Sequence, residues 1–427
     1  MGVPAVVTIG VFSDTHVGCS IPKAIGEKRK IAFQKAFSQA IDGFIREKVD
    51  YVIHTGDLFE RRTMSPADSV FVKSEFQRLV NNLKNVKILI IRGNHDGTIE
   101  NNALDYVRHP LAEYFIVLGE KTLIGEPELF DDGKIAVQGL GYTAYPAKKI
   151  KEKCDLIGEL FSNSKAEYKI FLLHAFIEHL TTIQYVPRHQ VISPELIKKL
   201  KANLVICGHQ HQKHDLYKIN NTYILIPGAT EAVELSDETT HGYFILSLDK
   251  EKITATFHPI TPLHRILNIK VESREKKDEK WFVDEAKSRI LDLLKANATQ
   301  KIILRVILNG LIEGDKYLVE EELQRFIANQ TEYSLIYFEI KNNLNVPFAP
   351  VEIPALETPA TIYPQIFSIL PEEKQIEAVR ITETIERMLE ESASPTTGLL
   401  TDAKRRVLLE RWKKIFETSE KEEKACQ

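Results

Sequence analysis

Polar residues able to bind metal ions follow several apolar runs that the sequence predicts to be strands. The stretch "IIRGNHDG", residues 90–97, shows the pattern: an apolar run leads into three polar residues between two glycines. Gly and Asn tolerate left-handed backbone angles, so a polar turn is one interpretation. The other is that Asn94 and His95 face a metal ion and a phosphate. The candidates with the same placement along the chain are Asp14, His16, Asp57, Asn94, His95, His174, His209 and His211.

The residue types in this set indicate a site for two divalent cations. Carboxylate and amide oxygens suit hard cations, whereas imidazole nitrogens suit Mn, Fe or Zn. Apart from His95, the set supplies two Asp, one Asn and four His, enough for two ions if one carboxylate bridges them. Alternate residues leaving a strand point the same way, which fits the spacing of Asp14 and His16 and of His209 and His211. Each of these short motifs, taken alone, is more often part of a polar loop. Because all of them occur in order and each follows a predicted strand, together they favour a metal site.

The elements that position these residues alternate between short β-rich runs and amphipathic helices up to about residue 260. This alternation predicts an α/β fold with layers of sheet covered by helices, and ligands in open α/β folds bind at the carboxyl edge of the sheet. The expected helices are Glu27–Glu47, Pro66–Leu83 and Pro194–Lys201. The expected strands are Val6–Phe12, Tyr51–His54, Lys87–Ile91, Lys134–Gln138, Tyr168–Leu173, Leu204–Cys207, Tyr223–Ile226 and Gly242–Leu248.

Three further segments follow the first domain, which we place at residues 1–261. Residues 262–345 show a β-α-β-α-β order without a cluster of ligand-type residues, which predicts a small α+β cap domain. Five prolines between residues 347 and 364 indicate a linker over 346–370. Residues 371–427 show two helical patterns, which predict a helical tail. The first pattern has Ile376, Val379, Ile385, Met388 and Leu389 near one face, and the second has Leu408, Trp412, Ile415 and Phe416.

The composition is that of an ordinary globular protein, with 43% hydrophobic and 27% charged residues. The net charge of −4 means that an enzyme acting on nucleic acid would need a local basic surface or bound cations to meet phosphates. Four cysteines without C-x-x-C spacing indicate a reducing compartment. No basic region precedes the first apolar run and no apolar stretch has the length of a membrane span, so we expect a cytoplasmic protein that does not bind a membrane.

The ordered motifs resemble those of the calcineurin-like metallophosphoesterases. Within them, "FSDTHVG", "HTGDLFE", "GNHDG", "GHQH" and "IPGATEAVELSDETTHGYF" are similar to the DNA-repair nucleases of the Mre-eleven/SbcD type, over about residues 5–345. The resemblance implies a metallophosphoesterase β-sandwich flanked by helices, a DNA-binding cap and a helical C-terminal tail. It implies that His95 faces the scissile phosphate without binding metal. It assigns one metal to Asp14, His16, Asp57 and His211 and the other to Asp57, Asn94, His174 and His209, with Asp57 bridging.

The same resemblance implies an activity, cofactors and partners. The activity is phosphodiester hydrolysis, as a 3′-to-5′ exonuclease and single-strand endonuclease of DNA in double-strand-break repair. The cofactors are two Mn²⁺ ions, with Zn²⁺ or Fe²⁺ as alternatives. The partners are DNA, a second copy in a homodimer, and a Rad-fifty/SbcC-type coiled-coil ABC ATPase bound through the C-terminal helices. We expect such a protein in an archaeal or bacterial cytoplasm, associated with DNA.

One departure from the family pattern concerns Glu60. Family nucleases often have His after Gly-Asp-Leu-Phe, and a Glu side chain cannot serve there as a cation that faces the phosphate. Nearby, His54 either orients a ligand from behind or is structural. Arg61 and Arg62 either line the phosphate path or are solvated.

Two other functions stay open at this point. "GDLFERR" faintly resembles the Gly-Asp-x-Val-Asp-Arg-Gly of protein phosphatases, which makes a metallophosphomonoesterase one alternative. Those phosphatases usually carry Glu after Asn-His, where this chain has Asp96, and they lack the added cap. The other alternative is a non-catalytic scaffold for the ATPase, against which the full ligand set argues.

Overall fold

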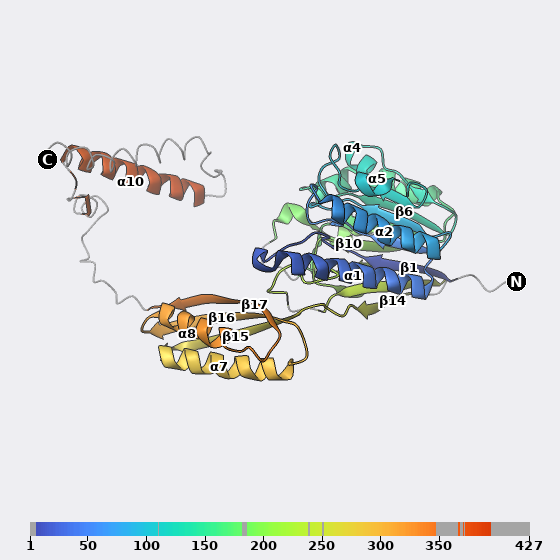
Figure 1. Ribbon diagram of the computed structural model, residues 1–427. Helices are drawn as coiled ribbons and strands as arrows, with labels where there is room; N and C mark the ends of the chain where they lie inside the picture. The colour runs from blue at the N-terminus through green and yellow to red at the C-terminus, as the bar shows by residue number, and fades with distance from the viewer. Residues whose placement is uncertain are drawn as a thin grey trace. The chain divides into compact units, whose positions relative to one another are not determined.

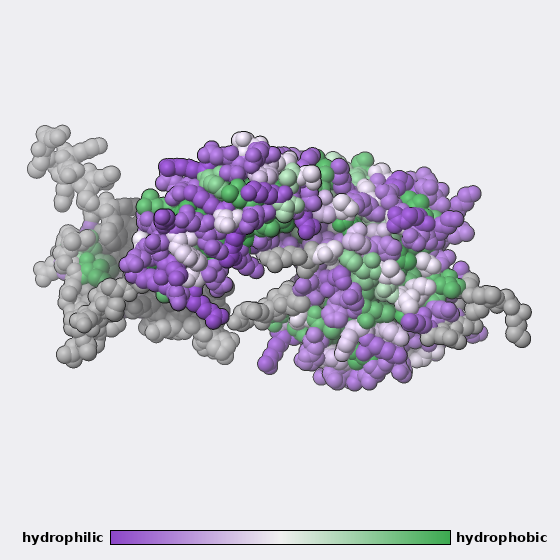
Figure 2. Space-filling model, turned by 90° about the horizontal axis from the view of Figure 1, so that it is seen from below, coloured by the Kyte–Doolittle hydropathy of each residue, from purple (hydrophilic) through white to green (hydrophobic). Residues whose placement is uncertain are grey.

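The structure, a computed structural model, describes residues 6–109, 111–181, 186–237, 240–249, 252–346, 366–367, 370 and 372–393 (Figure 1). The chain divides into two compact units, Met1–Val346 and Pro347–Gln427. Among the described helices, none combines the length and apolar character needed to cross a membrane. Hydrophilic residues cover most of the described surface in the view of Figure 2, with smaller apolar areas between them.

A six-stranded sheet carries the first three groups of polar residues. Strands β1 (Val7–Phe12), β2 (Tyr51–His54), β3 (Lys87–Ile91) and β4 (Phe115–Leu118) are parallel. Strands β13 (Gly242–Asp249) and β14 (Lys252–Pro259) add to the sheet antiparallel, giving the order β14-β13-β1-β2-β3-β4. Because β1, β2 and β3 are parallel neighbours, the loops that follow them meet at one edge of the sheet.

A second six-stranded sheet carries the remaining histidines. Its order is β11-β12-β10-β7-β6-β5, and the strands β6, β7, β10 and β12 are parallel. His174 and Gly208 are register partners at the ends of β7 and β10, so His174 and His209 lie close together. The strand bounds are Phe130–Asp131 for β5, Ile135–Leu140 for β6, Tyr168–His174 for β7, Leu204–Gly208 for β10, His214–Ile219 for β11 and Thr222–Ile226 for β12.

The two sheets pack face to face and share one buried apolar cluster. That cluster contains alternate residues of the central strands, among them Ile9, Val11, Ile53, Ile170, Leu172 and Ile206. The residues between them point to the opposite faces, where they pack against helices, as Phe12 and Val52 do in the first sheet and Leu173 and Cys207 in the second. Burial on both faces explains why these strands are continuous apolar runs in the sequence.

Helices cover the outer faces of both sheets (Figure 1). Helix α1 (Gly26–Glu47), which follows the short η1 (Lys23–Ile25), and helix α2 (Pro66–Asn82) pack on the first sheet. Helices α5 (Pro146–Asn163) and α6 (Pro194–Lys199) pack on the second. The connecting segments contain α3 (Asp105–Arg108), α4 (Glu120–Ile124), η2 (Arg188–Gln190) and the paired β8 (Phe176–Ile177) and β9 (Val191–Ile192). The predicted α/β sandwich flanked by helices is thus confirmed.

A smaller α+β domain ends the first unit. Strands β15 (Arg265–Asp278), β16 (Ile302–Glu313) and β17 (Leu335–Asn345) form a parallel sheet, connected by α7 (Glu279–Ala296) and α8 (Lys316–Ala328). Its helices and strands enclose an apolar core of their own. Asp278 and Asp315 cap the two helices by accepting hydrogen bonds from backbone N–H groups. The β-α-β-α-β order is confirmed, and the boundary at residue 262 stays a prediction.

The second unit contains α10 (Glu372–Ala393). Ala378 and Ile381 are buried, and Phe367 and Leu370 pack against them. The first expected tail helix is therefore confirmed, but Ile376, expected on its apolar face, is exposed because Ala378 and Ile381 form the buried face instead. The second expected tail helix, with Leu408, Trp412, Ile415 and Phe416, lies outside the described residues.

Candidate metal centre

The loops after β1 and β2 run side by side and carry the first candidates. Asp14 N–H donates to Gly56 O at 3.1 Å, and His16 N–H donates to Asp57 O at 3.1 Å. His54 strengthens this contact from the end of β2: its Nδ1 accepts from Gly56 N–H at 3.2 Å, and its Nε2 donates to Thr15 Oγ1 at 3.1 Å. Burial lowers the pKa of His54 to about 3, so this histidine is neutral and positions the loops.

His174 is at the centre of one group of candidate ligands. Its Nε2 lies 3.2 Å from Asp57 Oδ2, 3.0 Å from Asn94 Oδ1 and 3.1 Å from His209 Nδ1. Four side chains, each at or just after the end of a different strand, therefore direct a polar atom at the same small volume. Three of them, Asp57, His174 and His209, place ligand atoms within 4.8 Å of one another.

His16 is at the centre of the second group. Its Nε2 lies 3.3 Å from His211 Nε2 and 3.9 Å from Asp57 Oδ2. Asp14, His16 and His211 place ligand atoms within 4.8 Å of one another, and so do His16, Asp57 and His95. Asp57 thus reaches both groups, as a bridging carboxylate must.

The backbone at these loops adopts conformations that ordinary residues rarely take. Asp14, His16, Asp57 and His209 have φ values of 47°, 41°, 56° and 83°. Such left-handed residues cost about 1–3 kcal/mol each and persist where the surroundings fix them, which is common at functional sites. Glycine is required beside them, because a Cβ at Gly56 would collide with His174 and one at Gly93 would collide with Asp57.

Asp96 explains why a third polar residue follows Gly93 in "GNHDG". Its side chain is fully buried and accepts backbone hydrogen bonds from Asp57 N and Gly93 N, each at 2.9 Å, and from Phe59 N at 3.1 Å. Burial, with the charge of Asp57, raises the pKa of this carboxyl to about 6. Asp96 therefore connects the loops after β2 and β3 and leaves Asn94 and His95 directed at the cluster.

The second nitrogen of each of three imidazoles has a fixed partner. His174 Nδ1 donates to Thr55 O at 2.8 Å, and His95 Nδ1 donates to Glu60 O at 2.8 Å. His16 Nδ1 donates to the Glu60 carboxylate at 3.0 Å. Because each Nδ1 carries the proton, each Nε2 is the nitrogen left for a cation or a substrate.

Burial and neighbouring charges shift the pKa values of the side chains in the cluster. Burial opposes protonation of His174, yet the carboxylates of Asp57 and Asp14 raise its pKa to about 9. Burial also opposes ionisation of Asp57, yet the charge of His174 holds the pKa of that carboxyl well below its usual range. Burial lowers the pKa values of His209 and His211 to about 3, so both are neutral. Asp57 as a carboxylate and His209 and His211 as neutral imidazoles are in the protonation states that divalent cations require, whereas a cation at His174 would displace the Nε2 proton.

Arg61 and Arg62, expected either on the phosphate path or in solvent, lie on the loop after Glu60. Both are exposed, and neither forms an ion pair with a residue that the structure describes. They are therefore close in sequence to the cluster but are not part of its hydrogen-bond network.

The roles of three residues at this site were not predicted from the sequence. Glu60 and Thr55 orient imidazoles, as described above. The ring of Tyr142, from the segment after β6, lies 6.0 Å from the His174 ring and 5.7 Å from the His209 ring between centroids. Glu60 lies within a loop motif, which was some indication of a role. Thr55 acts through its backbone carbonyl and Tyr142 lies outside every motif, so the sequence indicated neither.

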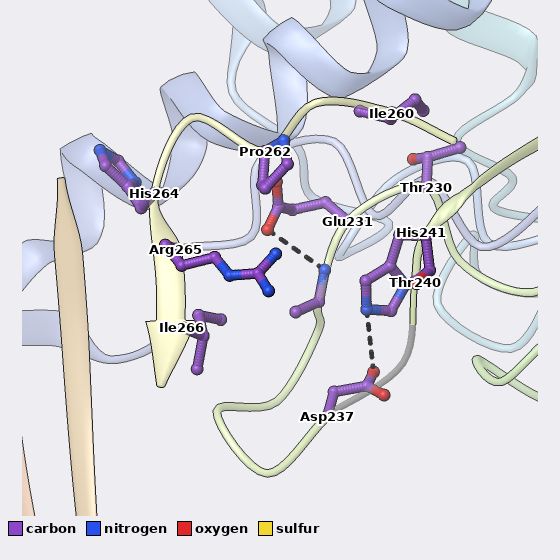
Figure 3. Close-up of a pocket in the computed structure, with 11 residues that line it drawn as sticks. Thr230, Glu231, Asp237, Thr240, His241, Ile260, Pro262, His264, Arg265 and Ile266 are labelled. Carbon is purple, nitrogen blue, oxygen red and sulfur yellow. Dashed lines mark hydrogen bonds and ion pairs between the residues drawn. The ribbon is translucent and has the colours of Figure 1, made fainter. Parts of the chain in front are cut away.

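A separate hollow of about 170 Å³ lies between the segment after β12 and the start of β15 and contains none of the candidate ligands. Figure 3 shows the Arg265 side chain extending into it, with Glu231 on the opposite wall, and Ala232 also lines the hollow. Behind that wall, the fully buried Arg29 of α1 donates to Glu231 Oε1 at 3.3 Å and to Ala232 O. This buried ion pair connects α1 to the end of the larger domain.

Two facing sheets covered by helices, with a cluster of carboxylate and imidazole at their carboxyl edge, define a metal-dependent phosphoesterase. Residues 7–213 match the calcineurin-like phosphoesterase family, a range that includes every candidate ligand from Asp14 to His211. Residues 7–213 therefore form a calcineurin-like phosphoesterase domain. That family implies a hydrolase of phosphoesters with a dinuclear divalent metal site, and the donor set present here fits one.

The expected similarity to nucleases of the Mre-eleven/SbcD type is also confirmed. DNA double-strand break repair protein Mre11 of Sulfurisphaera tokodaii is 25% identical over 385 residues, which cover 88% of this chain and 90% of that protein. Mre11 of Thermoplasma acidophilum is 31% identical over 192 residues, or 43% of each chain. Mre11 of Methanosarcina mazei is 27% identical over 277 residues, which cover 63% of this chain but 41% of that protein.

Solved structures also align with part of the chain. A dimetal phosphatase from Danio rerio covers 59% of this chain and 96% of its own, at 10% identity and a TM-score of 0.40.

Proposed function

We propose that this chain is a two-metal-dependent DNA nuclease that acts in double-strand-break repair. The observation that carries the proposal is the position of Asp57, whose Oδ2 lies 3.2 Å from His174 Nε2 and 3.9 Å from His16 Nε2. A carboxylate shared by two groups of ligands is what a two-metal site needs, since the ions in such sites are typically about 3.5–4 Å apart. The names of the Mre11 relatives, as DNA double-strand break repair proteins, support DNA as the substrate.

In this proposal each half of the cluster holds one Mn²⁺ ion. When bound, the ions supply an activated water and neutralise charge on the phosphate. The chain supplies ligands that are already oriented, through Thr55, Glu60 and Asp96. Imidazole with carboxylate and amide oxygen suits Mn²⁺, and Zn²⁺ or Fe²⁺ would use the same imidazoles. One ion takes Asp14, His16, Asp57 and His211, and the other takes Asp57, Asn94, His174 and His209.

His95 is proposed to contact the scissile phosphate. Its side chain is 37% exposed, whereas the side chains of His16 and His174 are fully buried. Because Nδ1 donates to Glu60 O, Nε2 is the nitrogen that faces outward. There it can stabilise the developing charge or protonate the leaving sugar oxygen. Arg61 and Arg62, exposed on the neighbouring loop, are proposed to meet flanking phosphates.

The proposal extends to the organisation of the whole chain. Residues 1–261 form the nuclease domain, 262–345 a DNA-binding cap, 346–370 a linker and 371–427 a tail that binds the Rad-fifty/SbcC-type ATPase. The activities are 3′-to-5′ exonuclease and single-strand endonuclease, carried out by a homodimer in an archaeal or bacterial cytoplasm. The archaeal origin of the Mre11 relatives supports this setting.

The proposal is tested by offering three substrates to the pure protein with Mn²⁺. These are end-labelled duplex DNA, circular single-stranded DNA and a chromogenic phosphomonoester. We expect Mn²⁺-dependent shortening of the duplex from the 3′ end and cutting of the circle. Hydrolysis of the monoester alone would exclude the nuclease and favour the phosphomonoesterase, and no hydrolysis of any substrate by the metal-loaded protein would favour the scaffold.

A further inference from the structure

Glu60 stands where the resembling nucleases often have His, but its carboxylate is directed inward and not toward a substrate. The side chain is only 12% exposed. Its Oε2 lies 3.0 Å from His16 Nδ1 and 3.9 Å from His95 Nδ1. The backbone is fixed as well, because Glu60 N–H donates to Val17 O at 3.1 Å. Glu60 is therefore held between the loop that carries His16 and the loop that carries His95.

His16 and His174, the histidines at the centres of the two groups, differ in the group that accepts a hydrogen bond from Nδ1. His16 Nδ1 donates to the anionic carboxylate of Glu60, whereas His174 Nδ1 donates to the neutral backbone carbonyl of Thr55. A carboxylate behind a metal-binding imidazole fixes the ring orientation and raises the basicity of the nitrogen that binds the metal. The backbone carbonyl fixes the orientation but adds no net charge.

We propose that Glu60 is a positioning residue that strengthens one metal position selectively, the one formed by His16 and His211. This inference rests on the two-metal site of the proposed function. The other position, formed by His174 and His209, does not depend on Glu60. The chain thus has a buried anion behind a metal ligand where the resembling nucleases often have a side chain that can carry a positive charge.

Glu60 also contacts His95, but through a different group. The hydrogen bond to His95 Nδ1 comes from the backbone carbonyl of Glu60, at 2.8 Å. Replacing the side chain removes the carboxylate behind His16 and leaves the partner of His95 in place. Side-chain variants of Glu60 therefore separate an effect on metal binding from an effect on the phosphate-facing histidine.

The test measures Mn²⁺ binding to the full-length protein when only one metal position is left. His209→Ala leaves the His16 position, and His211→Ala leaves the His174 position. We expect Glu60→Ala to weaken Mn²⁺ binding about 10–100-fold in the His209→Ala background and to leave it unchanged in the His211→Ala background. Glu60→Gln keeps an oxygen that accepts from His16 Nδ1 but loses the charge, so its effect should be smaller than that of Glu60→Ala. Glu113→Ala, an exposed carboxylate outside the cluster, is the matched control.

The outcomes separate a positioning role from a structural one. Equal weakening in both backgrounds would mean that Glu60 only maintains the fold, and unchanged binding in both would mean that it has no role in metal binding; either result overturns the inference. Glu60→Gln keeps the comparison available if the alanine variant does not fold. A wild-type protein that binds two Mn²⁺ ions without cutting DNA would contradict the proposed nuclease while leaving the test of Glu60 intact.

Discussion

Asp57 is the residue on which both halves of the cluster depend. We predict that Asp57→Ala loses both metal ions, because one carboxylate serves two groups of ligands. His211→Ala should weaken mainly one ion, because His211 lies against His16 and outside the group around His174. Isothermal titration calorimetry with Mn²⁺ gives the number of ions that each variant binds. The same residual stoichiometry in both variants would rule out a bridging Asp57.

His95 should behave differently from the ligands, although it lies close to two of them. We predict that His95→Asn keeps both metals and DNA binding and loses cleavage by about 10²–10⁴-fold, the range for a residue that acts by proton transfer. Its partial exposure and its hydrogen bond to a backbone carbonyl support a role toward the substrate. Elemental analysis of the purified variant, together with rates at saturating Mn²⁺, checks this. Loss of bound metal would show that His95 is a ligand.

At the scale of elements, the strand ends made the cluster predictable. Parallel strands with apolar residues on both faces are easy to recognise, and the residues that follow such strands must meet at one edge. The four edge strands of the two large sheets, β4, β5, β11 and β14, were not anticipated, because each lies at the end of its sheet and carries fewer buried apolar residues. The roles of Glu60, Thr55 and Asp96 could not be predicted either, because they depend on which way a loop turns a single carboxylate or carbonyl.

The contact between α1 and the segment after β12 gives a prediction about stability. Arg29 and Glu231 form an ion pair in which both side chains are almost completely buried. Removing one partner of such a pair leaves an uncompensated buried charge and typically costs about 3–5 kcal/mol. We predict a loss of that size in the free energy of unfolding for Glu231→Ala, measured by urea denaturation. Glu113→Ala is the exposed control, and a loss below about 1 kcal/mol for Glu231→Ala would mean that water reaches Arg29.

At the scale of the whole molecule, the chain divides into two compact units between residues 346 and 347. Every candidate ligand, both large sheets and the small α+β domain lie in the first unit. In the described part of the second unit, α10 buries Ala378 and Ile381 against Phe367 and Leu370 of the same unit. Nothing in the metal centre of the first unit requires a residue from α10, so catalysis and partner binding can be tested apart.

We therefore predict that truncation after Pro364 leaves the Mn²⁺-dependent nuclease activity nearly intact and abolishes binding of the Rad-fifty/SbcC-type ATPase. The physical reason is that the tail carries an apolar stripe in each expected helix, and a helix binds a partner groove through such a stripe. Aromatic anchors such as Trp412 and Phe416 would then supply much of the affinity. Co-purification of the ATPase with full-length and truncated protein, alongside nuclease assays of both, checks the prediction. A truncated protein that unfolds, or that loses its nuclease activity, would place the tail in the core of the enzyme, and retained ATPase binding would place the partner site elsewhere.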